Sequence, residues 1–135
     1  MLKVVGTMFI YNKKLLLNKP RKNPTYQLIA GKVEEYETVM EAAIRECHEE
    51  LGPKATFDET KFELISDFLE TASSDPNLKI HFYLFKYSGE LEGKFTTSEE
   101  IEDFIWYDTS MKAIPLSHVL NNKVITYCLE KKLIK

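Results

Sequence analysis

The sequence predicts an α+β fold in which helices pack on the faces of a mixed β-sheet. Short segments rich in β-branched and aromatic residues recur along the chain, and one segment has the apolar spacing of an amphipathic helix. These segments are interspersed without a regular βαβ rhythm, which favours a mixed sheet. The length of 135 residues fits one domain, which we expect to span residues 1–135.

The N-terminal part of the chain predicts a hairpin, a loop and a further strand. Two prolines in residues 19–25 indicate the loop, and Gly31 follows the last apolar segment. The expected elements are a strand at 4–11, a turn at 12–14, a strand at 15–18 and a strand at 26–30.

Residues 38–51 give the clearest helix. Thr38 is a suitable N-cap, and Glu41 three residues later completes a capping box. Gly52 ends the helix and Pro53 prevents its continuation. One face carries an apolar stripe made of Met40, Ala43, Ile44, Cys47 and Leu51.

The rest of the chain predicts further strands and a second helix. An acidic loop is expected at 90–102. The remaining elements are strands at 62–70 and 78–87 joined by a turn at 73–77, a strand at 104–107, and a helix within 117–132.

The bulk composition narrows the class of function. A net charge of −3 argues against a nucleic acid polymer or an acidic membrane as the main partner. The chain lacks an uninterrupted signal-peptide core and any apolar run long enough to span a bilayer. Cys47 and Cys128 fit buried thiols in a reducing compartment. We therefore expect a soluble cytoplasmic protein.

Three carboxylates on the expected helix point to a metal site. The spacing of Glu46, Glu49 and Glu50 places them on one side of the helix. Like charges four residues apart, and acids in the last turn of a helix, are both unfavourable. A divalent cation such as Mg²⁺ would offset this cost, since hard cations take oxygen ligands. The alternative is a solvated acidic face partly neutralised by Arg45 and surface lysines.

The segment around these carboxylates favours the metal site. Residues 31–53 read GKVEEYETVMEAAIRECHEELGP, and this stretch resembles the Nudix box. A chance match at its seven fixed positions is of the order of one in 10⁸ per window. The resemblance implies the α/β/α sandwich of Nudix hydrolases. The matching positions are Gly31, Glu37, Arg45, Glu46, Cys47, Glu49, Glu50 and Gly52.

The resemblance also implies roles for individual residues. The backbone carbonyl of Gly31 would be a metal ligand, and Glu46 and Glu50 would be the principal ligands of Mg²⁺ or Mn²⁺. Glu49 would be a further ligand or the base that activates water, and these two roles stay open.

Two further parts of the site follow from the same resemblance. Glu37 would pair with Arg45 and fix the loop on the helix, as support for catalysis. Family members often supply one more carboxylate from a distant loop, and Glu100 occupies the matching place, with Glu99 in reserve. A solvated acidic loop is the alternative there.

The implied activity is attack of water on phosphorus in a nucleoside triphosphate, with modified or oxidised triphosphates included. The expected products are the nucleoside monophosphate and pyrophosphate. Dinucleoside polyphosphates and nucleotide sugars are alternative substrates. A nucleotide-binding module without turnover, and an acidic interaction domain, are the alternatives from other classes. We expect a monomer or a homodimer.

The chain departs from the family pattern just before the box. Ile29 and Ala30 replace a Pro and a Gly that many relatives carry, which raises the question of the backbone geometry beside the metal. Pro53 replaces an aliphatic residue beyond the helix, where we expect little effect.

Overall fold

The computed structural model describes residues 1–72, 75–91 and 95–135. They form two compact units, one made of residues 1–8 and 29–96 and the other of residues 9–28 and 97–135. The expectation of one domain over residues 1–135 stays a prediction.

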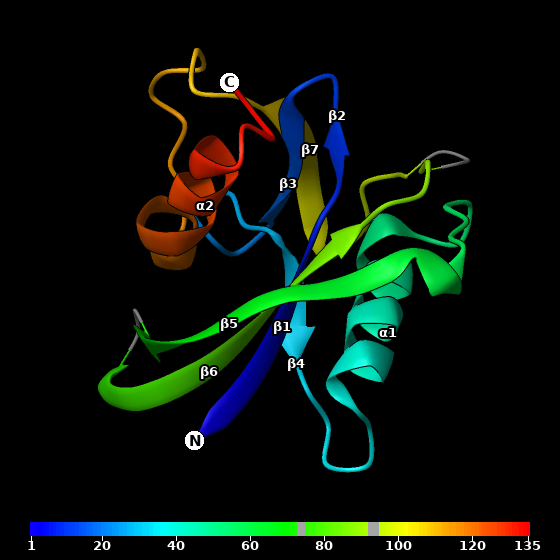
Figure 1. Ribbon diagram of the computed structural model, residues 1–135, viewed down its shortest axis with the longest axis vertical. Helices are drawn as coiled ribbons and strands as arrows, with labels where there is room; N and C mark the ends of the chain where they lie inside the picture. The colour runs from blue at the N-terminus through cyan, green and yellow to red at the C-terminus, as the bar shows by residue number, and fades with distance from the viewer. Residues whose placement is uncertain (73–74, 92–94) are drawn as a thin grey trace. The chain divides into compact units, whose positions relative to one another are not determined.

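The first unit contains a four-stranded mixed sheet with α1 lying against it (Figure 1). The strand order is β4-β1-β6-β5; β1 runs parallel to β6, and the other neighbours are antiparallel. A short 3-10 helix, η1, leads into β5. The elements are β1 (Leu2–Met8), β4 (Ile29–Lys32), α1 (Val39–Leu51), η1 (Glu59–Lys61), β5 (Phe62–Ala72) and β6 (Asp75–Tyr87).

The helix α1 has the predicted caps. The side chain of Thr38 accepts a hydrogen bond from the backbone of Glu41, and the Glu41 side chain accepts one from the backbone of Thr38. Gly52 follows the helix with φ of 90°, a conformation that favours glycine. Ala43, Cys47 and Leu51 from the predicted stripe are buried, and so is Ala42. Local sequence signals therefore set both ends of α1 and its buried side.

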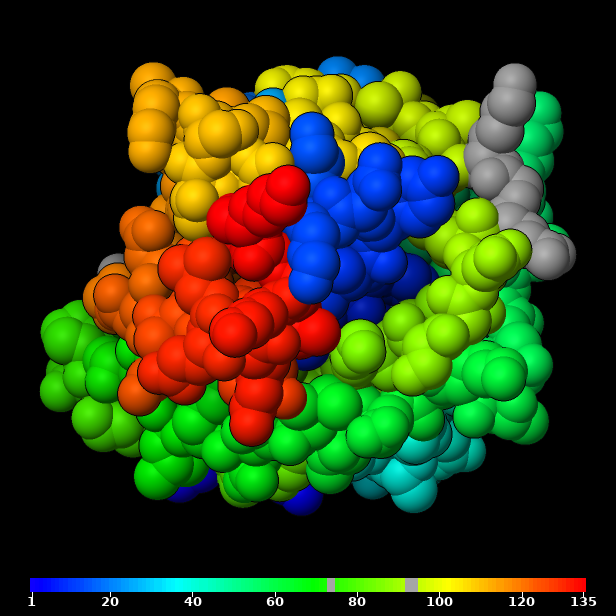
Figure 2. Space-filling model, turned by 45° about the horizontal axis from the view of Figure 1, so that its top comes forward, coloured from blue at the N-terminus to red at the C-terminus, as the bar shows by residue number. Residues whose placement is uncertain are grey.

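The second unit contains a three-stranded antiparallel sheet of order β2-β3-β7. Asn12 and Lys13 form the turn between β2 and β3 with φ of 56° and 62°. The C-terminal residues run beside this turn, where Lys13 bonds the backbone of Lys132 and Lys135 (Figure 2). The elements are β2 (Ile10–Tyr11), β3 (Lys14–Pro20), β7 (Ile101–Tyr107), the π-helical turn η2 (Leu120–Val124) and α2 (Ile125–Glu130).

Several predicted boundaries are wrong because strand pairing overrides local preference. The expected strand at 4–11 is divided into β1 and β2, and β4 starts at Ile29 because the residues before it make only isolated bridges. Ser73 and Ser74 of the expected turn lie outside the described residues, and residues 75–77 belong to β6.

The later boundaries differ as well. The expected acidic loop at 90–102 ends earlier because pairing with β3 brings Ile101 and Glu102 into β7, and its residues 92–94 lie outside the described residues. The helix expected within 117–132 is divided into η2 and α2. Among the described residues, no helix is long and apolar enough to cross a bilayer.

The capping box predicts the effect of one substitution. Thr38→Ala removes the acceptor for the Glu41 backbone N–H, so we expect a loss of about 1 kcal/mol in the free energy of unfolding. Urea unfolding followed by circular dichroism measures this loss. Thr97→Ala, at an exposed position, is the control, and equal stability of the two variants would contradict the capping role.

Candidate functional site

The centre of the candidate site is the guanidinium of Arg45. Its Nε and Nη2 donate to the carboxylate of Glu37, and Nη2 also donates to the carbonyl of Lys32 at 2.9 Å. Its Nη1 donates to Glu46 at 2.7 Å and to Glu49 at 3.2 Å. A guanidinium has five N–H groups, and these five bonds match that number. One edge of Arg45 thus fixes the loop before α1, and Nη1 contacts two of the carboxylates predicted to bind metal.

The pair of Glu37 and Arg45 is strongly ionic. The Glu37 side chain is only 6% exposed, and its carboxylate also accepts the backbone N–H of Glu34 at 2.8 Å. The hydrogen bond from Arg45 is the main reason why the pKa of Glu37 is lowered, although burial acts in the opposite direction. The same bond raises the pKa of Arg45. The structure therefore contains the ion pair that the resemblance implied, and its supporting role in catalysis stays a prediction.

Gly31 makes room for the carboxylate of Glu46. A Cβ at position 31 would lie 2.1 Å from Cδ of Glu46 and 2.3 and 2.4 Å from its two oxygens, so any other residue would displace this carboxylate. The Glu46 side chain is 15% exposed. The structure thus brings together the backbone of β4 and a carboxylate of α1, which the sequence assigned to one metal site.

Glu46 and Glu50 both lie near the thiol of Cys47. Burial is the main cause that raises the pKa of this thiol, and a hydrogen bond with Thr7 lowers it. The charges of the two carboxylates add to the rise. One oxygen of Glu50 is buried, whereas the Glu49 side chain is 57% exposed. Glu49 is therefore the most accessible of the three to solvent and to a substrate.

The donor set fits a hard divalent cation. It consists of carboxylates and a backbone carbonyl, which are the ligands that Mg²⁺ prefers, and the space beside Gly31 already holds the Glu46 carboxylate. Across the described residues, no three acidic, histidine or cysteine side chains gather closely enough to hold an ion. Glu46 and Glu49 instead accept hydrogen bonds from the guanidinium of Arg45.

Ile29 and Ala30 occupy regular strand positions. Ile29 is opposite Thr7 and Ala30 opposite Gly6 in the antiparallel pairing of β4 with β1. Neither residue has a positive φ. The alanine therefore requires no backbone conformation reserved for glycine, which removes the concern about geometry beside the box.

The predicted distal ligand belongs to the other unit. Glu100 is exposed, its N–H donates to the hydroxyl of Ser98 at 3.2 Å, and its carbonyl accepts the N–H of Arg21 at 2.9 Å. Glu99 is exposed beside it. The assignment of either residue to the metal site stays a prediction.

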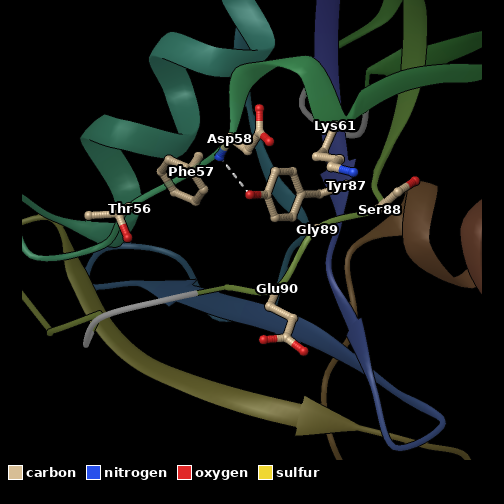
Figure 3. Close-up of a pocket in the computed structure, with 8 residues that line it drawn as sticks. All are labelled: Thr56, Phe57, Asp58, Lys61, Tyr87, Ser88, Gly89 and Glu90. Atoms are coloured by element: carbon tan, nitrogen blue, oxygen red, sulfur yellow. Dashed lines mark hydrogen bonds between the residues drawn. The ribbon is translucent and has the colours of Figure 1, made fainter.

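A hollow in the first unit was not predicted from the sequence. It has a volume of about 500 Å³ and lies between two segments that are far apart in the chain (Figure 3). None of the residues predicted for the catalytic site lines it. Its lining residues are Thr56, Phe57, Asp58, Lys61, Tyr87, Ser88, Gly89 and Glu90.

Comparisons with known proteins support the motif. The family model described as the NUDIX domain matches residues 1–123. A search of curated protein sequences finds no match.

Three solved structures illustrate the similarity of fold. The solution structure of the E. coli ORF135 protein has a TM-score of 0.73 and 22% identity, over 98% of this chain and 91% of that one. A MutT NUDIX hydrolase from Burkholderia pseudomallei has a TM-score of 0.73 and 20% identity, over 96% and 95%. An ADP-ribose pyrophosphatase from Streptococcus suis has a TM-score of 0.65 and 18% identity, over 97% and 91%. At these identities the likeness shows the fold, and it confirms the predicted α+β class with a mixed sheet.

The burial of Glu37 predicts the effect of removing its partner. Arg45→Ala leaves a buried carboxylate without its main donor, so we expect a loss of about 1–3 kcal/mol in the free energy of unfolding. Because the pKa of Glu37 is lowered in the folded protein, the pair stabilises the fold above the usual Glu pKa of 4.5 and loses this effect as the pH falls through the folded pKa. The stability of the Arg45→Ala protein should therefore lack the decrease at acidic pH that comes from this ion pair.

Melting temperatures measured from neutral to acidic pH test this prediction. Arg21→Ala is the control. Arg21 is exposed, and its Nε donates to the carbonyl of Ser98 within the second unit. An Arg45→Ala protein with the melting temperature of the wild type would exclude the support role.

The contact between Gly31 and Glu46 predicts the effect of a second substitution. Gly31→Ala places a Cβ where the carboxylate lies, so we expect affinity for Mn²⁺ to fall by about tenfold or more, as for other changes that misorient metal ligands. Stability in chelator should change little, because the displaced group is the end of a flexible side chain. Calorimetric titration with Mn²⁺ measures the affinity, with Ala30→Gly as the control. Unaltered Mn²⁺ affinity in Gly31→Ala would separate Gly31 from the metal site.

Proposed function

Because this chain belongs to the NUDIX domain family, we propose that it is a metal-dependent pyrophosphohydrolase acting on a nucleoside triphosphate, with modified or oxidised triphosphates included. The family establishes the coarser activity, hydrolysis of a phosphoanhydride bond. The observation that supports the finer proposal is the array of Arg45, Glu37 and Glu46 beside Gly31, with every charged residue of the box retained. The products would be a nucleoside monophosphate and pyrophosphate.

The carboxylates and one carbonyl would hold the cation. Glu46, Glu50 and the carbonyl of Gly31 would be its ligands, with Glu100 as a further candidate. Bound Mg²⁺ or Mn²⁺ would neutralise charge on the phosphate oxygens and increase the nucleophilicity of water near neutral pH. Glu49 is exposed enough either to join the ligands or to take the proton from the attacking water.

Arg45 would support the reaction in two ways. Its Nε and Nη2 would keep Glu37 and the loop after β4 in place, whether or not metal is bound. Its Nη1 would compensate the charge of Glu46 and Glu49 in the metal-free protein, so the carboxylates would exchange these bonds for metal contacts. Arg45 is thus a positioning residue in this proposal, and it does not touch the reacting atoms.

Other substrates and another class of function compete with this proposal. Dinucleoside polyphosphates and nucleotide sugars present the same phosphoanhydride bond to the same carboxylates. A nucleotide-binding module without turnover would not need Glu46, Glu49 and Glu50 together, and this favours the enzyme. We further propose a cytoplasmic location, which the two cysteines support. The proposed oligomeric state is a monomer or a homodimer.

The assignment of Glu50 as a ligand predicts a separation of activity from stability. Glu50→Gln should lower turnover by more than about 100-fold, since loss of contacts outside the ligand shell already costs roughly 10–100-fold in metal sites. Stability in chelator should be kept or rise slightly, because a like-charge pair with Glu46 that costs about 0.2–0.5 kcal/mol is removed. Turnover assays and melting curves provide both readouts, with Glu63→Gln as control. Near-normal turnover in Glu50→Gln would contradict the ligand role.

The proposed activity is tested with a panel of substrates. Release of pyrophosphate and phosphate is measured from nucleoside triphosphates, dinucleoside polyphosphates and nucleotide sugars, with Mg²⁺ or Mn²⁺ and with chelator. We expect metal-dependent release of pyrophosphate from a triphosphate. Release from another class would correct the substrate, and no release by folded protein that binds metal would favour the binding module.

A further inference from the structure

The hollow beside the end of α1 has an aromatic wall. Phe57 and Tyr87 both line it, with ring centroids 5.8 Å apart and planes at 84° (Figure 3). Phe62 packs behind them, 6.1 Å from Phe57 and 5.0 Å from Tyr87. His48 of α1 meets Phe57 edge to face at 4.9 Å. The hollow has a volume of about 500 Å³, which lies within the range of pockets that bind small molecules.

Hydrogen bonds connect the two segments that form the hollow. The backbone N–H of Asp58 donates to the hydroxyl of Tyr87 at 2.7 Å, and the N–H of Ser88 donates to the carbonyl of Lys61 at 2.9 Å. Gly89 allows the chain to pass close to Tyr87, because a Cβ there would lie 2.8 Å from the Tyr87 hydroxyl oxygen. The shape of the hollow is therefore formed before any ligand enters.

The charges around the hollow determine the class of ligand. Two carboxylates line the hollow, from Asp58 and Glu90, together with one ammonium, from Lys61. Bonds from Thr60, and then the charge of Lys61, lower the pKa of Asp58, so this carboxylate is ionised at neutral pH. A negative rim repels the phosphates of a nucleotide and attracts a cation.

From this geometry we propose that the hollow binds a small organic cation of the alkylamine class. Its carbon chain would pack on Phe57 and Tyr87, and one ammonium group would lie beside the carboxylate of Glu90. Aromatic faces and carboxylates together are a favourable environment for such a cation. The site is separate from the box residues and does not depend on the proposed hydrolysis.

The experiment uses 1,4-diaminobutane as the probe and 1,4-butanediol as its uncharged analogue of the same length. Each is titrated into the whole protein in chelator, without nucleotide, and amide shifts are followed by NMR. We expect saturable shifts at residues 56–61 and 87–90 with the diamine only. The diamine should bind more weakly at high salt, because ionic strength screens exposed charges.

Two variants locate the binding. Glu90→Gln and Phe57→Leu should each weaken binding of the diamine by about five- to tenfold, or roughly 1–1.4 kcal/mol. Glu130→Gln removes the same charge at an exposed position of the other unit and should leave the affinity unchanged. Glu90 is exposed, so its substitution should not alter folding.

Three results would overturn the proposal. The first is equal binding of butanediol, the second is no saturable shift at 56–61 and 87–90, and the third is normal affinity in Glu90→Gln. Shifts confined to Glu46, Glu49 and Glu50 would show that the diamine substitutes for metal at the box, which also excludes the hollow. Hydrolysis is measured separately, so a failure here leaves the proposed activity untouched.

Discussion

The rest of the candidate site depends on the planar guanidinium of Arg45. It holds Glu37 and the carbonyl of Lys32 with one edge, and the carboxylates of Glu46 and Glu49 with Nη1. These contacts connect the strand end, the loop and the helix within the first unit. A lysine offers a single ammonium and cannot span these acceptors. Because all five donors are used, the same side chain sets the position of the loop and the orientation of the Glu46 and Glu49 carboxylates.

This arrangement also accounts for the unfavourable placement of acids on α1. Glu46, Glu49 and Glu50 lie in the second half of the helix, where the macrodipole disfavours negative charge. Arg45 supplies one positive charge, which offsets only part of their repulsion. The remaining negative charge is what a divalent cation would neutralise in the proposed site.

The sequence predicted the helix because its signals are local, since Thr38, Glu41 and Gly52 act within a few residues. The pairing of Glu37 with Arg45 was expected only through the resemblance to the Nudix box. Strand ends were less predictable, because β6 begins at Asp75 only through its pairing with β5. The hollow escaped prediction for the same reason, since its walls come from segments about thirty positions apart and meet through the Tyr87 hydroxyl.

The two cysteines give each unit its own internal reporter. Cys47 lies in the first unit and Cys128 in the second; both are buried, and neither forms a disulfide with a described residue. A thiol reagent can reach either sulfur only when the surrounding packing opens, so the labelling rate of each residue measures the local opening of its own unit. Mass spectrometry distinguishes the two peptides. The chain can therefore report, without any engineered labelling site, whether its two units open together or one before the other.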